Sequence, residues 1–208
     1  MFGIHDFHVF LLTSILLNLT PGPDTFYILG RSLAQGRGAG VASVLGISTG
    51  SLVHTLAAAF GLSAFLATSA SAFLVVKLVG AAYLVYLGAR MLFSRSISTA
   101  IPAGFSSSGF WAVYRQGLLT NVLNPKVALF FLALIPQFIA AESSSKFAAF
   151  ITLGLCFIAT GTIWCLCLAW FSSRLGERLR GSKNFGDILN RTAGALFIGL
   201  GARLATTK

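Results

Sequence analysis

Residues Gly38 to Val76 read GAGVASVLGISTGSLVHTLAAAFGLSAFLATSASAFLVV, and this stretch contains no Asp, Glu, Lys or Arg. It is longer than the roughly 20 apolar residues that a helix needs to cross about 30 Å of hydrocarbon. The whole chain has 208 residues, of which 56% are hydrophobic and only 10% are charged. Soluble domains carry about 25% charged residues. The composition therefore predicts an integral membrane protein of the α-helical class.

Hydropathy predicts six membrane-spanning helices in a single transmembrane domain over residues 1–208. The first three helices form one repeat, at about 7–93, and the last three form a second, at about 116–206. A Ser- and Gly-rich linker, at about 94–115, joins the two repeats. The expected fold class is an all-α membrane protein. The six predicted spans are Phe7–Leu29, Val41–Ala67, Ala72–Phe93, Gln116–Ala140, Phe147–Phe171 and Ile188–Thr206.

Short motifs recur in the two halves of the chain, in the same order and at offsets of 103, 111 and 113 residues. This agreement predicts an internal duplication. Because each unit has three spans, the second unit enters the membrane upside down relative to the first, as in transporters built from inverted repeats. The matching pairs are Asn18 with Asn121, Thr49-Gly-Ser51 with Thr160-Gly-Thr162, and Leu87-Gly-Ala-Arg90 with Leu200-Gly-Ala-Arg203.

Positive charge is distributed unevenly between the two sides of the predicted membrane domain. Connections after the first, third and fifth spans hold ten basic residues, whereas the opposite side holds four. Cytoplasmic connections are enriched in Lys and Arg, so both termini are expected on the non-cytoplasmic side. The same bias explains the formal charge of +10, and no nucleic-acid partner is expected. The ten are Arg31, Arg37, Arg90, Arg95, Arg115, Arg174, Arg178, Arg180, Lys183 and Arg191, and the four are Lys77, Lys146, Arg203 and Lys208.

Two polar segments interrupt the first and fourth predicted spans, Asn18-Leu-Thr-Pro-Gly-Pro-Asp24 and Asn121-Val-Leu-Asn-Pro-Lys126. Proline removes a backbone donor and glycine permits unusual dihedral angles, so both helices are expected to open there. In hydrocarbon, interrupted backbone survives only where it faces protein or a water-filled cavity. The segments therefore predict a polar site where the two halves meet. The residues expected to break the helices are Pro21, Gly22, Pro23 and Pro125.

Asp24 and Lys126 place one acid and one base inside predicted spans. An ionised residue near the bilayer centre costs at least about 2.5–3.5 kcal/mol, which favours a functional role. The simplest arrangement pairs the two, and an amino-acid zwitterion fits between them. A permanent structural salt bridge is the alternative, and both hold if substrate competes with the bridge. The predicted substrate-binding residues are Asn18, Thr20, Asp24, Asn121, Asn124 and Lys126.

Proton coupling is expected at Asp24, and His54 is a second candidate because an imidazole exchanges protons near neutral pH. The alternative for His54 is a neutral, hydrogen-bonded side chain in the bundle. No nucleophile–base–acid set points to an enzyme, so no catalytic residue is expected. The sequence predicts no metal site and no cofactor either. Cys156, Cys165 and Cys167 lack metal-ligand spacing and are expected to be small buried hydrophobes.

Over essentially its whole length the chain resembles the LysE/RhtB family of amino-acid exporters. The resemblance implies export of amino acids from the bacterial cytoplasm across the inner membrane, driven by the proton motive force. Substrate, protons and lipid are then the partners, and a homo-oligomer is left open. The motifs that carry the resemblance are Thr20-Pro-Gly-Pro-Asp24, Gly80-Ala-Ala-Tyr83-Leu-Val-Tyr86-Leu-Gly88, Asn121-Val-Leu-Asn124-Pro-Lys126 and Gly194-Ala-Leu-Phe197.

No second carboxylate lies within a predicted span, which favours a neutral substrate such as threonine, homoserine or leucine over lysine. Two other classes stay open. A membrane thiol-redox carrier would use paired cysteines, but Cys165 and Cys167 point about 200° apart on a helix. A non-transporting membrane scaffold would make no use of an intramembrane acid and base.

Overall fold

The structure is a computed structural model that describes residues 2–62 and 108–175, with isolated positions at 78, 82, 85, 86, 89, 198 and 202. Regular secondary structure in these residues is entirely helical, and an isolated antiparallel bridge joins Ile4 to Ile139. The prediction of an all-α protein is confirmed for this part of the chain.

Nine helical segments make up the two long described stretches. They include short π-helical and 3-10 segments that directly continue α-helices. The elements are α1 (Phe7–Leu19), α2 (Pro23–Gln35), α3 (Arg37–Ala57), π-helical η1 (Ala58–Leu62), α6 (Phe110–Val122), α7 (Pro125–Leu129), π-helical η2 (Phe130–Leu134), 3-10 helical η3 (Ile135–Phe138) and α8 (Lys146–Leu175).

Two described helices are long and apolar enough to cross a membrane, Arg37–Gly61 and Lys146–Ser172. A third candidate is the broken pair formed by α6 and Pro125–Phe138, which is bent by 48°. These correspond to the second, fifth and fourth predicted spans. Apart from the isolated positions given above, the third and sixth predicted spans, the motifs at residues 80–88 and 194–197 and most of the linker lie outside the described residues, so the six-span arrangement stays a prediction.

Two predicted segment limits were wrong. The first span, expected to end at Leu29, continues to Gln35 beyond the break between α1 and α2. The fourth span begins at Phe110 rather than Gln116, so the end of the expected linker is helical. Arg115 lowers the hydropathy of this turn, which hid the helix. Aromatic packing stabilises the turn, since the Trp111 ring lies 5.6 Å from that of Tyr114.

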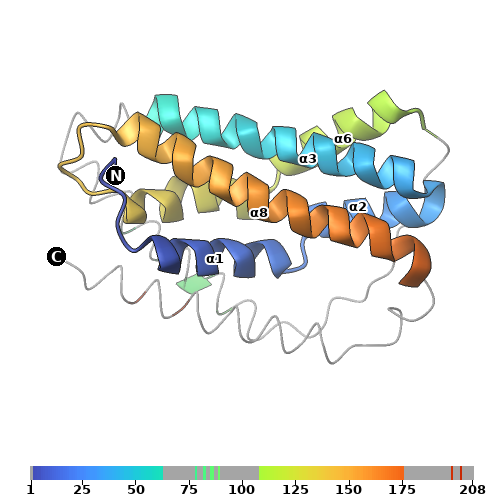
Figure 1. The fold of residues 1–208 in the computed structure, drawn as a ribbon, viewed down its shortest axis with the longest axis horizontal. Helices are drawn as coiled ribbons and strands as arrows, with labels where there is room; N and C mark the ends of the chain where they lie inside the picture. Colours follow the sequence, from blue (N-terminus) through green and yellow to red (C-terminus); the bar gives the residue numbers. More distant parts are fainter. Residues whose placement is uncertain are drawn as a thin grey trace.

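The helices form an elongated bundle in which α3 and α8 lie side by side and α1 and α2 follow one another end to end (Figure 1). Buried apolar side chains form two clusters. The larger one joins α1, η1, η2, η3 and the first half of α8, and contains Phe10, Phe131 and Phe150. The smaller one joins α2, α3 and the last part of α8 around Ile28 and Ile47. The two helix breaks lie between these clusters.

Close packing of α3 on α6 depends on glycine. A Cβ added at Gly46 would meet the carbonyl oxygen of Tyr114 and would lie 2.9 Å from the backbone nitrogen of Leu118. A Cβ at Gly38, in the first turn of the same helix, would meet nothing within 4 Å. The backbones of α3 and α6 therefore approach as closely as small residues allow in membrane bundles.

Replacing Gly46 by Ala is expected to lower the free energy of unfolding by about 1–3 kcal/mol, because backbone atoms cannot move aside without separating the helices. Gly38→Ala is the matched control and should leave stability unchanged or raise it by up to about 1 kcal/mol, since alanine favours helix more than glycine does. Thermal unfolding of the purified variants in detergent measures the difference. Equal shifts of the unfolding temperature for the two variants would show that α3 and α6 can accommodate a Cβ at Gly46 without loss of stability.

Candidate functional site

The first helix break is built by local backbone chemistry. Thr20 ends α1 in an extended conformation, with its N–H and its hydroxyl both donating to Leu16 O, at 3.0 Å and 2.7 Å. Pro21 and Gly22 continue the extended chain, and Pro23 is the first residue of α2. Proline suits that position because the missing N–H would have had no helical partner.

The second helix break repeats this plan between α6 and α7. Asn124 caps α7, since its side-chain oxygen accepts from the backbone N–H of Lys126 at 3.0 Å. Pro125 is the first residue of α7, as Pro23 is of α2. Both prolines thus start a helix directly after an extended residue, and both breaks leave helix ends facing the interior of the bundle.

The acid and the base lie at helix ends of opposite polarity: Asp24 at the start of α2 and Lys126 beside the end of α1. Asp24 lies in the first turn of α2, and its Oδ2 accepts from Asn121 Nδ2 at 2.8 Å. Lys126 Nζ donates to the carbonyl oxygens of Leu17 and Thr20, at 3.2 Å and 2.9 Å, which belong to the C-terminal end of α1. A helix N-terminus favours negative charge and a C-terminus favours positive charge. Each ionisable group is therefore partly compensated without the other.

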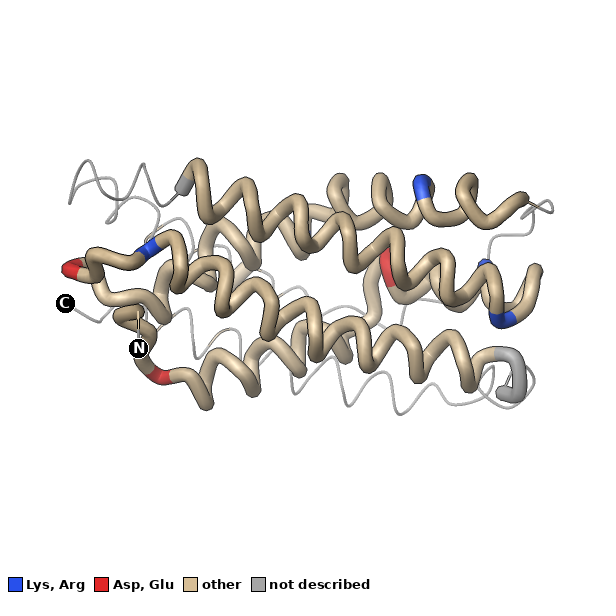
Figure 2. Tube along the Cα trace, turned by 45° about the horizontal axis from the view of Figure 1, so that its top comes forward, with Lys and Arg blue, Asp and Glu red and all other residues tan. Residues whose placement is uncertain are grey.

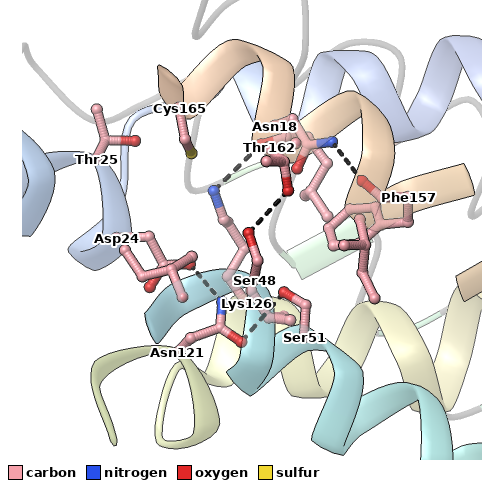
Figure 3. Close-up of a pocket in the computed structure, with 15 residues that line it drawn as sticks. Asn18, Asp24, Thr25, Ser48, Ser51, Asn121, Lys126, Phe157, Thr162 and Cys165 are labelled. Atoms are coloured by element: carbon pink, nitrogen blue, oxygen red, sulfur yellow. Dashed lines mark hydrogen bonds between the residues drawn. The ribbon is translucent and has the colours of Figure 1, made fainter. Parts of the chain in front are cut away.

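The expected direct pair is not formed, because no ion pair joins the side chains of Asp24 and Lys126, both of which are described. They line a common cavity of about 40 Å³ and are close enough to interact electrostatically (Figure 3). A cavity of this size holds a few water molecules. The residues that line it are Leu17, Asn18, Asp24, Thr25, Ile47, Ser48, Ser51, Asn121, Lys126, Val127, Phe157, Ile158, Gly161, Thr162 and Cys165. We call this the polar cavity.

Four of the six predicted binding residues line the polar cavity: Asn18, Asp24, Asn121 and Lys126. Thr20 and Asn124 are buried but do not line it, and they act instead through the helix breaks. A second candidate for proton coupling, His54, also lies outside the lining. Its Nε2 donates to the backbone carbonyl of Asn121 at 3.2 Å, because a carbonyl oxygen can only accept.

Several polar residues of the cavity wall were not predicted from the sequence. Ser51 donates to Asn121 Oδ1 at 3.2 Å, and the hydroxyls of Ser48 and Thr162 lie 2.7 Å apart (Figure 3). Ser51 and Thr162 belong to the two Thr-Gly-Ser/Thr motifs that had shown the repeat. That recurrence was the available signal, because polar residues beside a repeated glycine mark the place where another helix comes close.

Apolar side chains close the polar cavity toward both ends of the bundle. Leu17, Val127 and Phe157 belong to the larger apolar cluster, and Ile47 belongs to the smaller one. Ligand sites usually enclose about 300–1,000 Å³, so the polar cavity cannot hold an amino acid without an outward movement of its walls.

The polar cavity offers one carboxylate, one ammonium, two amides, several hydroxyls and one thiol. Asp24 Oδ1 is buried and has no hydrogen bond of normal geometry, although the Asn124 side chain lies near this carboxyl group. Buried polar atoms are almost always paired, so this oxygen marks a position for a further donor. Residues 2–62 and 108–175 contain no cluster of three His, Cys, Asp or Glu side chains that could hold a metal ion.

The three cysteines are free thiols in different surroundings. Cys165 is half-buried and lines the polar cavity, whereas Cys167 is exposed on the surface of α8. The expectation of three small buried hydrophobes is therefore wrong for Cys167. The positions of Cys165 and Cys167 do not favour a reversible disulfide between them.

Comparisons with known proteins agree with the motifs at the two breaks. A profile of the LysE type translocator family matches residues 15–208. A membrane protein of Vibrio cholerae serotype O1, described as uncharacterized, is 32% identical over 205 residues, which cover 99% of this chain and 98% of the relative. The leucine efflux protein of Salmonella typhimurium is 27% identical over 205 residues, covering 99% and 97%. No solved structure matches the chain.

The family profile spans both helix breaks, the relatives align over nearly their whole length, and two of the described helices are long and apolar enough to cross a membrane. The resemblance inferred from the motifs is thereby confirmed, and the chain belongs to the LysE type translocators, a family of membrane proteins that export amino acids.

Proposed function

We propose that this protein exports a neutral amino acid across the bacterial inner membrane in exchange for protons, and that the zwitterion binds at the polar cavity. The carrying observation is that Asp24 and Lys126 line one cavity from opposite helix breaks without pairing with each other. Opposite charges held apart in this way match the ammonium and carboxylate of an amino acid. Asn18 and Asn121 supply amide donors and acceptors beside them.

Substrate binding is expected to replace contacts that the protein now makes with itself. The ammonium group would donate to Asp24, whose Oδ1 has no hydrogen bond of normal geometry. The carboxylate would draw Lys126 Nζ away from the carbonyl oxygens of Leu17 and Thr20. Competition therefore takes place at the end of α1, and not at an Asp24–Lys126 bridge as the sequence suggested.

Proton coupling is assigned to Asp24, because a carboxylate that loses the substrate ammonium can take a proton in its place. His54 is the second candidate. Its Nε2 and the Asp24 carboxylate both contact Asn121, one at the backbone carbonyl and the other at the side-chain amide. A change of protonation at Asp24 or at His54 can thus affect the other group through Asn121.

An inverted repeat of three plus three helices is supported by reciprocal contacts between the halves. Asn121, in the second half, packs on Gly50 so closely that a Cβ there would lie 2.7 Å from the Asn121 Cβ. Asn18, in the first half, packs on Gly161 in the same way, with 3.0 Å to Asn18 Oδ1. Asn18 and Asn121 are sequence counterparts, and so are Gly50 and Gly161. In both contacts, therefore, the asparagine of one half packs on the glycine of the other half.

Both termini are proposed to face away from the cytoplasm. The end of α2, the starts of α3 and α6 and the end of α8 lie at one end of the bundle (Figure 1). Arg31, Arg37 and Arg115 belong to these segments. Charged residues of the described chain lie mainly toward the helix ends, and an acidic residue lies near mid-length (Figure 2). Under the positive-inside rule the arginine-rich end is cytoplasmic.

The test is transport by the purified protein in liposomes loaded with radiolabelled amino acids. Counterflow and flux driven by an imposed pH gradient should both appear for at least one neutral amino acid, such as leucine, threonine or homoserine. A variant with all three cysteines replaced by serine should retain this flux. Absence of flux across a full amino-acid panel, in both gradient directions, would favour a membrane scaffold. Loss of activity in the cysteine-free variant would favour thiol-redox chemistry.

A further inference from the structure

A second and larger cavity adjoins the polar cavity. Its volume is about 400 Å³, which falls in the size range of small-molecule sites, and it opens to the surface at the exposed residues Gly61 and Leu132. Besides His54, the described residues that line it are Ala57, Ala58, Gly61, Ala128, Phe131 and Leu132. We call it the apolar pocket. It lies where α3 and η1 meet α7 and η2.

The wall between the two cavities is thin. Val127 lines the polar cavity and the next residue, Ala128, lines the apolar pocket. The Phe131 ring of the apolar pocket lies 5.5 Å from the Phe157 ring of the polar cavity. Asn121 connects the two, since its side chain lines the polar cavity and its carbonyl accepts from His54.

The chemistry of the apolar pocket selects its ligand. None of the described residues that line it carries a fixed charge, and His54 is the one polar side chain among them. A charged ligand group would lose its hydration there without gaining a partner, which is strongly unfavourable. A hydrocarbon group loses no hydrogen bonds there, and its removal from water is favourable. The apolar pocket therefore fits an aliphatic chain of a few carbon atoms.

We infer that the apolar pocket receives the hydrocarbon side chain of the substrate, while the polar cavity holds its ammonium and carboxylate. This rests on the proposed function and narrows it to neutral amino acids with aliphatic side chains. The polar cavity of about 40 Å³ is too small for a whole amino acid, and the apolar pocket supplies the missing volume.

Movement of the wall is needed to join the two cavities, and the local structure permits it. The element α7 has five residues, with the break at Pro125 before it and the π-helical η2 after it. The facing element η1 is π-helical as well. Such segments are frequent at functional sites, because their backbone hydrogen bonds shift with little cost. The His54 ring stacks on Phe131 with centroids 5.8 Å apart, so the two rings would move together.

Gly61 gives a direct test, because a Cβ at this position meets nothing within 4 Å and a larger side chain can extend into the apolar pocket. The Gly61→Leu variant is expected to lower the ratio of leucine to alanine counterflow at least about tenfold, as for a hydrophobic pocket that loses room for a few methylene groups. Gly38→Leu, at the other end of the same helix and equally unobstructed, should leave the ratio unchanged.

A second variant tests the opposite change. Leu132→Ala enlarges the apolar pocket and should raise the ratio of phenylalanine to leucine counterflow, which a variant that merely folds poorly cannot do. Equal loss of leucine and alanine flux in Gly61→Leu, with no change of ratio in Leu132→Ala, would overturn the inference. A wild-type protein that carries no amino acid would instead overturn the proposed function itself.

Discussion

Replacing Asp24 by Asn is expected to abolish flux driven by a pH gradient while the protein still inserts and folds. The amide has nearly the same shape, and its oxygen can still accept from Asn121 Nδ2, which donates to Asp24 Oδ2 at 2.8 Å in the native cavity. It cannot take up a proton or carry the charge that receives the substrate ammonium. Loss of one partner of a buried charged contact costs about 2–5 kcal/mol, so we expect a decrease in flux of at least about thirtyfold.

Asp6→Asn is the matched control for this change. Asp6 precedes α1, is exposed and lies outside both cavities, so the same loss of one charge should leave flux unaltered. Counterflow without a gradient separates the two proposed roles of Asp24. Loss of gradient-driven flux with residual counterflow would assign Asp24 to the proton alone, and loss of both would assign it to substrate as well. Unchanged gradient-driven flux would refute both roles.

The positions of the helix breaks could be predicted from the sequence because proline acts locally. Pro23 and Pro125 each start a helix directly after an extended residue, and no distant contact is needed to explain it. Asp24 and Lys126 were recognisable for a related reason, since a charge within an apolar segment needs compensation. The exact compensation was not predictable. It depends on which helix ends meet in space, and the carbonyl oxygens at the end of α1 are invisible in a residue pattern.

The cavity wall was predicted less well than the breaks. Ser48, Ser51 and Thr162 look like ordinary small residues of membrane helices, whose hydroxyls usually bond to their own backbone. Here the close approach allowed by Gly50 and Gly161 brings them to other helices. The repeated Thr-Gly motifs contained this information, but only the pairing of Asn121 with Gly50 and Asn18 with Gly161 reveals it. The apolar pocket left no sequence signal, because alanine and glycine are common throughout the chain.

Lys126 has both a structural contact and a proposed binding role, and its replacement removes both. Lys126→Met keeps the length and apolar part of the side chain but removes the donor to the carbonyl oxygens of Leu17 and Thr20. It also removes the proposed partner of the substrate carboxylate. Counterflow and gradient-driven flux are therefore both expected to fall at least about thirtyfold, again from the loss of a buried charged contact. Lys146→Met is the control, because Lys146 Nζ donates to Ser143 O at the start of α8, away from the cavity.

Combining Lys126→Met with Asp24→Asn decides how the two charges depend on each other. Removing one of two interacting buried charges leaves the other poorly compensated, whereas removing both can be nearly neutral. The double variant should consequently be more stable than the sum of the single losses predicts, by about 1–3 kcal/mol in thermal unfolding, as expected for coupled neighbours. Its transport should stay absent, because no charge is left to receive either end of the zwitterion. Additive stability losses would mean that each charge is balanced by its helix end alone, and recovered transport would show that neither residue binds substrate.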